Sequence, residues 1–319
     1  MNANVIQQGN EIYLRVAKNI GGRRVEEWYV YNLKDKPLGA GAMGTVYLGR
    51  SHYPNPGMKV AIKRVADQYT HIPSIRERAR LEASMLFRHQ HLVEMVGCCE
   101  YAFNQGPIFI ISHLVQGMTL DEHVKRHLNH REDRVKRICQ CFYPVLEALD
   151  YLHAKDIVHL DIKPTNIMIE HGSNIRLMDL GIAFSADAAR LMSNGLIGTP
   201  QYAAPEQNVG ISNDVGISPA TDIYETGVSL YELLADYNPF DAPTTAESIL
   251  RHQTENLPYV DGVPKAVVDV LRRATAKSPQ ERYQSALIFK NELIKAVATP
   301  DPVPSFWSKI GRFFKNNHK

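Results

Sequence analysis

The chain has 319 residues, of which 44% are apolar and 22% are charged, so length and composition predict a globular protein of two lobes or domains. The formal net charge is only +2, from 36 Lys and Arg against 34 Asp and Glu, and no nucleic-acid partner is expected. The sequence has no run of 18 apolar residues and no apolar leader at its start, which argues against a membrane span and a secretory signal.

The four cysteines occur as two close pairs, Cys98-Cys99 and Cys139-Gln140-Cys141. Neither pair has the CxxC spacing of a zinc site, and thiols within apolar runs are usually buried. Because free thiols persist in a reducing compartment, we expect a cytoplasmic protein.

Residues 12–30 alternate between apolar and polar side chains on both sides of Gly21-Gly22. This pattern predicts a β-hairpin, which we assign to an N-terminal extension over residues 1–32. A small lobe of antiparallel strands with one helix is expected over residues 33–115. Its strands are predicted at 45–50, 59–65, 92–99 and 108–115.

A glycine-rich motif of the form GxGxxGxV lies near the start of this lobe, Gly39-Ala40-Gly41-Ala42-Met43-Gly44-Thr45-Val46. Glycines let the main chain turn tightly and bring its N–H groups close to phosphate oxygens. The same pattern marks dinucleotide folds, but there a helix follows directly. Here Thr45 to Leu48 favour a strand, so we interpret the motif as a phosphate-binding loop between two strands.

A second motif, Val60-Ala61-Ile62-Lys63, follows on an apolar strand. Such a Lys can reach nucleotide phosphates when a carboxylate holds it, whereas a strand-end Lys otherwise extends to solvent. The carboxylate is expected on the helix that starts near Pro73. At about 100° per residue, Glu82 shares the apolar face of this helix and Glu77 points nearly opposite. We therefore predict that Glu82 pairs with Lys63, with Glu77 as the alternative.

Beyond Gly117 the pattern becomes helical, and apolar residues from Val135 to Leu152 recur at three- and four-residue spacing, which predicts a long buried helix. A larger, mainly helical lobe is expected over residues 116–298. Its short strands are predicted at 166–170 and 175–178, and its further helices at 220–236, 245–253, 263–275 and 283–298.

The most informative segment of the chain is His159-Leu160-Asp161-Ile162-Lys163-Pro164-Thr165-Asn166, which is followed by Asp179-Leu180-Gly181. It offers an Asp as a base, an Asn five residues later as a metal ligand, and a second Asp before a Gly. This arrangement suits the transfer of a phosphoryl group from a Mg-bound nucleotide to a hydroxyl group.

Together and in this order, the motifs resemble the eukaryotic-like (Hanks-type) Ser/Thr protein kinases, over about residues 33–297. The resemblance implies an α+β bilobal protein-kinase-like fold with ATP and Mg²⁺ between the lobes. It also implies an enzyme that transfers the γ-phosphoryl group to Ser or Thr hydroxyls of protein substrates, itself included.

The resemblance also assigns chemical roles to single residues. Asp161 becomes the catalytic base, and Lys163 neutralises charge on the transferred phosphoryl group. Thr199 hydrogen-bonds near both, and Asn166 and Asp179 hold Mg²⁺ through hard oxygen ligands.

The adenine is implied to contact main-chain groups of His113 and Val115, next to a small side chain at Ser112. The whole implied nucleotide-binding set is Gly39, Ala40, Gly41, Ala42, Gly44, Val46, Ala61, Lys63, Glu82, His113 and Val115.

The segment Gly198–Glu206, together with Lys163, favours a protein acceptor over a small molecule, because related small-molecule phosphotransferases generally lack this Lys. The family pattern further implies that Glu206 forms a buried pair with Arg282 and that Asp222 supports the catalytic loop. A pseudokinase or scaffold that binds nucleotide or partners without turnover is the alternative function.

Leu160 departs from the family pattern, in which many members place an Arg that receives a phosphate on the activation loop. Leu cannot make that charge-assisted contact. We therefore hypothesise that activity does not require phosphorylation of Ser185 or Ser193, the hydroxyl side chains between Asp179 and Thr199.

The C-terminal segment 299–319 begins with a proline-rich linker, which ends the preceding helix. The tail then carries an apolar stripe among basic residues, formed by Phe306, Trp307, Ile310, Phe313 and Phe314. Such a tail could lie on an anionic membrane, dock on a partner, or fold back on the large lobe. The expected location is thus cytoplasmic with a peripheral membrane contact as an option, and nothing in the sequence specifies an oligomeric state.

Overall fold

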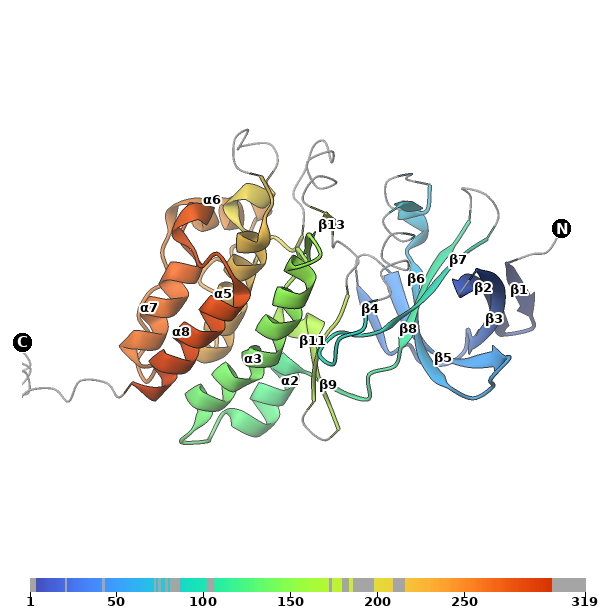
Figure 1. Ribbon diagram of the computed structural model, residues 1–319, viewed down its shortest axis with the longest axis horizontal. Coiled ribbons are helices and arrows are strands. Elements are labelled where there is room, and N and C mark those ends of the chain that lie inside the picture. The colour runs from blue at the N-terminus through green and yellow to red at the C-terminus, as the bar shows by residue number, and fades with distance from the viewer. Residues whose placement is uncertain are drawn as a thin grey trace, which may run out of the picture.

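The computed structural model describes residues 4–20, 22–41, 44–71, 73, 76–77, 80, 87–101, 106–171, 174–179, 184–185, 198–208 and 216–299. These residues form two lobes that lie side by side along the longest axis of the molecule (Figure 1). One lobe is a curled antiparallel sheet and the other consists mainly of helices, which confirms the predicted bilobal α+β fold.

The strands of the small lobe are β1 (Val5–Gln8), β2 (Glu11–Ile20), β3 (Arg23–Asn32), β4 (Gly39–Gly41), β5 (Gly44–Tyr53), β6 (Lys59–Val65), β7 (Met95–Glu100) and β8 (Ile108–His113). The short strands of the large lobe are β9 (Gly117–Thr119), β10 (Ile157–Val158), β11 (Ile167–Glu170), β12 (Ile175–Leu177) and β13 (Phe184–Ser185). Its helices are α2 (Leu120–His123), which continues as a π-helical turn, α3 (Arg134–His153), α5 (Pro219–Ala235), α6 (Thr245–Thr254), α7 (Lys265–Ala274) and α8 (Ala286–Ala298).

The small-lobe sheet runs in the order β1-β2-β3-β5-β6-β8-β7, with β4 paired to β5. The hairpin of β2 and β3 lies where the alternating pattern predicts one, and it joins the sheet because β3 pairs with β5. The sheet curls until β2 rests on β7, where a Cβ added at Gly97 would lie 2.5 Å from Val16 Cγ1. In Figure 1, β1 to β3 lie at the end of the small lobe that is far from the helices.

Both faces of the central small-lobe strands are buried, because side chains of a strand alternate between the two sides. One set faces the N-terminal strands and forms a core with them. This core consists of Val5, Ile12, Leu14, Val16, Tyr29, Tyr31, Val60, Ile62, Val96, Cys99, Phe109 and Ile111. The other set, which includes Lys63, Ile110 and Ser112, faces the cavity between the lobes. This two-sided burial explains the consecutive apolar residues at 60–62 in β6 and at 108–111 in β8.

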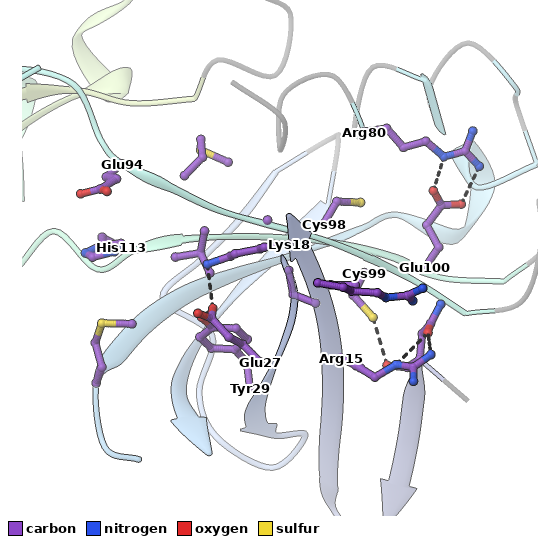
Figure 2. Close-up of a pocket in the computed structure, with 18 of the residues that line it drawn as sticks. Arg15, Lys18, Glu27, Tyr29, Arg80, Glu94, Cys98, Cys99, Glu100 and His113 are labelled. Atoms are coloured by element: carbon purple, nitrogen blue, oxygen red, sulfur yellow. Dashed lines mark hydrogen bonds and ion pairs between the residues drawn. The ribbon is translucent and has the colours of Figure 1, made fainter. Parts of the chain in front are cut away.

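A groove of about 990 Å³ lies between β2 and β7 (Figure 2). Its charged side chains are paired within the lobe: Lys18 Nζ lies 2.7 Å from a Glu27 oxygen, and Arg80 forms an ion pair with Glu100. The Cys99 thiol donates to the Asn4 carbonyl at 3.1 Å, which ties the start of the described chain to β7.

The core of the large lobe surrounds α3 and α5. The apolar stripe predicted between Val135 and Leu152 is buried in α3, and α8 packs against this helix. Almost every residue of α5 is buried, including polar residues such as Asp222 and Glu225. Buried polar groups are stable only when they are hydrogen-bonded, so α5 is expected to hold neighbouring main chain in place. None of the helices in the described residues has the length and hydrophobicity required to cross a lipid bilayer.

Candidate active site

A cavity of about 460 Å³ lies between the two lobes. The sequence-predicted residues that line it are Gly39, Val46, Ala61, Lys63, His113, Val115 and Asp179. Ser112, expected beside the adenine, and Leu114, between His113 and Val115 in the expected hinge, also line it. The remaining lining residues were missed by sequence reasoning: Leu38, Val93, Met95, Ile110, Gly117, Met118, Thr119, Glu122, Met168 and Met178. Of these, Met168 and Met178 had a usable signal, since they stand two residues after Asn166 and directly before Asp179 on predicted strands.

The glycine-rich motif forms a β4–β5 hairpin in which Gly41 is paired with Gly44 and Ala40 with Thr45. A Cβ at Gly44 would lie 2.2 Å from the Arg64 carbonyl oxygen, and the residue has φ of 151°, so only glycine fits. Among the described residues, no atom comes within 4 Å of a Cβ added at Gly39 or Gly41, which leaves open space beside the main chain. Ala42 lies outside the described residues.

Lys63 projects from β6 toward the large lobe, and its Nζ lies 2.7 Å from Asp179 Oδ1. The contact joins residues 116 positions apart and therefore spans the cavity between the lobes. The predicted partner Glu82 lies outside the described residues. Glu77, the alternative, is helical and exposed, as expected for a residue opposite the apolar face.

The hinge between the lobes follows β8. Ser112 is opposite Ala61 on β6, so its side chain faces the same cavity as Lys63. The main-chain N–H of His113 donates to the Glu94 carbonyl at 2.9 Å, so this N–H is not available to a ligand. Any main-chain contact between His113 and a nucleotide base would therefore involve its carbonyl oxygen.

The side chains that surround Asp161 form a compact hydrogen-bond network. Thr199 Oγ1 donates to Asp161 Oδ1 at 2.6 Å, and Lys163 Nζ donates to Asp161 Oδ2 at 2.8 Å. Lys163 Nζ also lies 2.7 Å from Thr199 Oγ1, and Asn166 Nδ2 donates to Asp161 Oδ2 at 2.9 Å. The structure thus brings together all three residues assigned to catalysis and one of the two assigned to the metal.

The loop that precedes Asp161 is held in place by hydrogen bonds to α5. Asp222 accepts the main-chain N–H groups of His159 and Leu160, with the shortest distance to each at 2.9 Å. These bonds fix Leu160 in a left-handed conformation with φ of 66°, which a non-glycine residue adopts only when its surroundings impose it. His159 is fully buried and its Nε2 lies 3.0 Å from the Met178 carbonyl, so it links the two halves of the site.

A buried ion pair between Glu206 and Arg282 anchors the end of the Gly198–Glu206 segment. Arg282 donates to both oxygens of Glu206, at 2.6 and 2.8 Å, and both side chains are buried. Such a bidentate pair is a strong contact, and removal of one partner leaves an uncompensated buried charge.

The side-chain oxygens of Asn166 and Asp179 are ligands of the kind that fits a Mg²⁺ ion. Burial opposes ionisation of Asp179, but the positive charge and hydrogen bond of Lys63 outweigh it and hold the pKa of this carboxyl below its usual value. Asn166 uses its Nδ2 on Asp161, and within the described residues no hydrogen bond reaches its Oδ1.

Comparison with known proteins identifies the family. The model of the protein kinase domain family matches residues 32–294, so the chain belongs to this family. It is 32% identical over 82% of its length to Ser/Thr-protein kinase Pkn1 of Myxococcus xanthus, and 30% identical over 78% to PrkC of Bacillus subtilis. It is also 32% identical over 85% of its length to PknH of Mycobacterium tuberculosis. The matches cover 37%, 38% and 42% of these three relatives, respectively, so the chain spans less than half of their length.

Proposed function

We propose that this chain is an ATP- and Mg-dependent protein kinase that transfers the γ-phosphoryl group to Ser or Thr hydroxyls of protein substrates, itself included. The observation that carries the proposal is the network of Asp161, Lys163 and Thr199, because it places a carboxylate, a cation and a hydroxyl within 3 Å of one another. The names of the relatives, all Ser/Thr-protein kinases, support the same acceptor class.

In this mechanism the acceptor hydroxyl donates its proton to the Asp161 carboxylate as the phosphoryl group arrives. Three hydrogen bonds fix the orientation of that carboxylate, so positioning contributes more than proton affinity. Lys163 Nζ neutralises charge on the transferred group, and Lys63 holds the nucleotide phosphates. Bound Mg²⁺, held by Asn166 and Asp179, would neutralise the charge that develops on the phosphate oxygens.

The test is incorporation of labelled phosphate from ATP into the protein itself and into a generic Ser/Thr substrate. Asp161→Asn is expected to lower kcat by about 10²- to 10⁴-fold while the variant still binds Mg·ATP. Lys63→Met is expected to abolish incorporation, and Lys295→Met serves as the matched control, since Lys295 is exposed on α8.

Two results would contradict the proposal. Wild-type protein that binds Mg·ATP without incorporation would favour the pseudokinase or scaffold alternative. Equal rates for wild type and Asp161→Asn would show that this carboxylate is not the base.

The location and the tail belong to the same proposal. Residues 300–319 lie outside the described residues, so the expected basic amphipathic tail is supported by its sequence pattern alone. We propose a cytoplasmic protein whose tail contacts an anionic membrane surface or a partner. Co-sedimentation with vesicles rich in anionic lipid, with and without residues 300–319, tests the membrane contact.

A further inference from the structure

Glu225 is a fully buried carboxyl group on α5, one turn after Asp222. Burial and the nearby charges of Asp222 and Asp161 raise its pKa well above the usual value. No ion pair within the described residues joins Glu225 to a cation. A polar group that is costly to bury needs specific hydrogen bonds, and these identify what it contacts.

Both oxygens of Glu225 accept a hydrogen bond. The main-chain N–H of Ile162, the residue directly after Asp161, donates to Oε2 at 2.8 Å. The side-chain amide of Gln207 donates to Oε1 at 2.8 Å, and it also lies 3.3 Å from the Leu160 carbonyl oxygen. Glu225 and Gln207, here called the Glu225–Gln207 clamp, therefore contact the main chain immediately before and immediately after the proposed base.

The clamp also holds the segment that would bind the acceptor. Gln207 Oε1 accepts the main-chain N–H of Ala204 at 2.5 Å. A Cβ added at Gly198 would lie 2.7 Å from the Leu160 carbonyl oxygen and 2.9 Å from Gln207 Nε2, and Gly198 has φ of 96°. The chain on either side of Thr199 is thus packed directly on the clamp.

We propose that the Glu225–Gln207 clamp is a positioning device that fixes the Asp161 carboxylate relative to the acceptor-binding segment. The inference rests on the proposed kinase activity and adds two residues to it. Leu160 is apolar and buried, so it offers no charged side chain through which another segment could hold this loop. The clamp performs the task through the main chain instead.

The test exchanges donor and acceptor across the clamp. Glu225→Gln sets two amide groups against each other, and Gln207→Glu sets two carboxyl groups against each other. Each single variant is expected to lose kcat by about ten- to a hundredfold, because small displacements of a reacting group are costly, with the KM for ATP unchanged. The unfolding temperature is expected to fall, because each change leaves a buried polar group without its partner, so kcat is measured well below it. The double variant Glu225→Gln/Gln207→Glu restores the complementary pair but leaves the Leu160 carbonyl without its donor, so it is expected to regain part of the lost kcat.

The matched control is Thr226→Val, on the same buried helix, because the Thr226 hydroxyl bonds within the helix to the Asp222 carbonyl. Wild-type kcat in both single variants would overturn the proposal. So would a loss of kcat that is accounted for by weaker ATP binding or by the fraction of unfolded protein at the assay temperature, or a double variant no better than the singles. Should one single variant fail to fold, the other single variant and the double variant carry the same comparison.

A second readout does not depend on turnover. Hydrogen exchange of the Ile162 amide is expected to be faster in Glu225→Ala, which lacks both acceptor oxygens, than in wild type and unchanged in Thr226→Val. Equal exchange in all three would refute the clamp itself. A wild-type protein without phosphate incorporation but with this exchange pattern would instead refute the proposed activity and leave the clamp in place.

Discussion

Buried ionisable side chains in the large lobe are accommodated in two ways, either as a charged pair or as a neutral group. Glu206 and Arg282 keep their charges because each neutralises the other. His252 is buried against Tyr224 and Phe240, where burial first, and then the charge of Lys277, lowers its pKa to about 3. The folded protein therefore holds this imidazole neutral over a pH range in which an unfolded chain would protonate it.

His252 makes stability depend on pH. In the unfolded chain the His252 imidazole binds a proton near pH 6.5, whereas in the folded chain it does so only near pH 3. The free energy of unfolding therefore falls as the pH is lowered through this range. Between pH 7 and pH 5 this group alone is expected to remove about 2 kcal/mol. In denaturant unfolding, the free energy of unfolding of His252→Gln should fall less between pH 7 and pH 5 than that of wild type. The exposed His130→Gln is the control, and equal losses in wild type and His252→Gln would contradict the prediction.

Leu160 is fully buried, so this position presents no cation to a phosphorylated activation segment. We expect the double variant Ser185→Ala/Ser193→Ala to retain phosphate incorporation into a generic substrate, because a phosphate on either residue would find no cation at position 160. Ser193 lies outside the described residues, and Ser185 is on β13. A folded double variant without activity would show that one of these hydroxyls must be phosphorylated.

Among the elements, the crossing of β2 over β7 determines how the small lobe closes. Val16 is buried and β-branched, so it has little freedom to move away from a new Cβ at Gly97. Gly97→Ala is expected to cost about 1–3 kcal/mol, the usual range for overpacking. Addition of Val16→Ala removes the clash but not the backbone strain at position 97, where φ is 159°, so the double variant should lose less stability than the sum of the two single losses. Denaturant unfolding of the three variants measures the coupling, and additive losses would refute it.

Elements with a clear period could be predicted from the sequence, whereas contacts between distant elements could not. The hairpin of β2 and β3, the helix α3 and the strands β5, β6 and β8 follow their apolar patterns closely. The short strand β1 has no alternating pattern and forms only because β2 offers it an edge. The contact between Val16 and Gly97 joins residues far apart in the chain, and no local pattern predicts it.

The same limit applies to the site. Resemblance to a family supplied Asp161, Lys163, Thr199 and Asp179, because each belongs to a motif. Glu225 and Gln207 belong to no motif that could be recognised, and periodicity says only that a residue of α5 is buried, not which main-chain group it will bind. Buried carboxyl groups therefore become informative only once their partners are seen.

The whole molecule is two lobes with the cavity between them, so a ligand that binds both should stabilise the folded chain. At about 100 times its Kd, Mg·ATP is expected to add about 2.7 kcal/mol to the free energy of unfolding. Lys63→Met and Asp179→Asn should each lose most of this gain, since the two residues contact each other across the cavity. Thermal unfolding with and without Mg·ATP measures the effect.

The control for this measurement is Lys36→Met, an exposed small-lobe position. It should keep the full gain. An unchanged ligand effect in Lys63→Met and Asp179→Asn would mean that Mg·ATP binds elsewhere.

The N-terminal hairpin has a practical consequence for where this domain starts. The family match begins at residue 32, whereas the hydrophobic core of the small lobe begins at Val5. A chain cut at the family boundary would lose half of that core and expose Val60, Ile62, Phe109 and Ile111 to water. The folding domain is therefore longer than the segment that the family match covers. Truncation at residue 32 would yield an aggregation-prone fragment rather than a minimal enzyme.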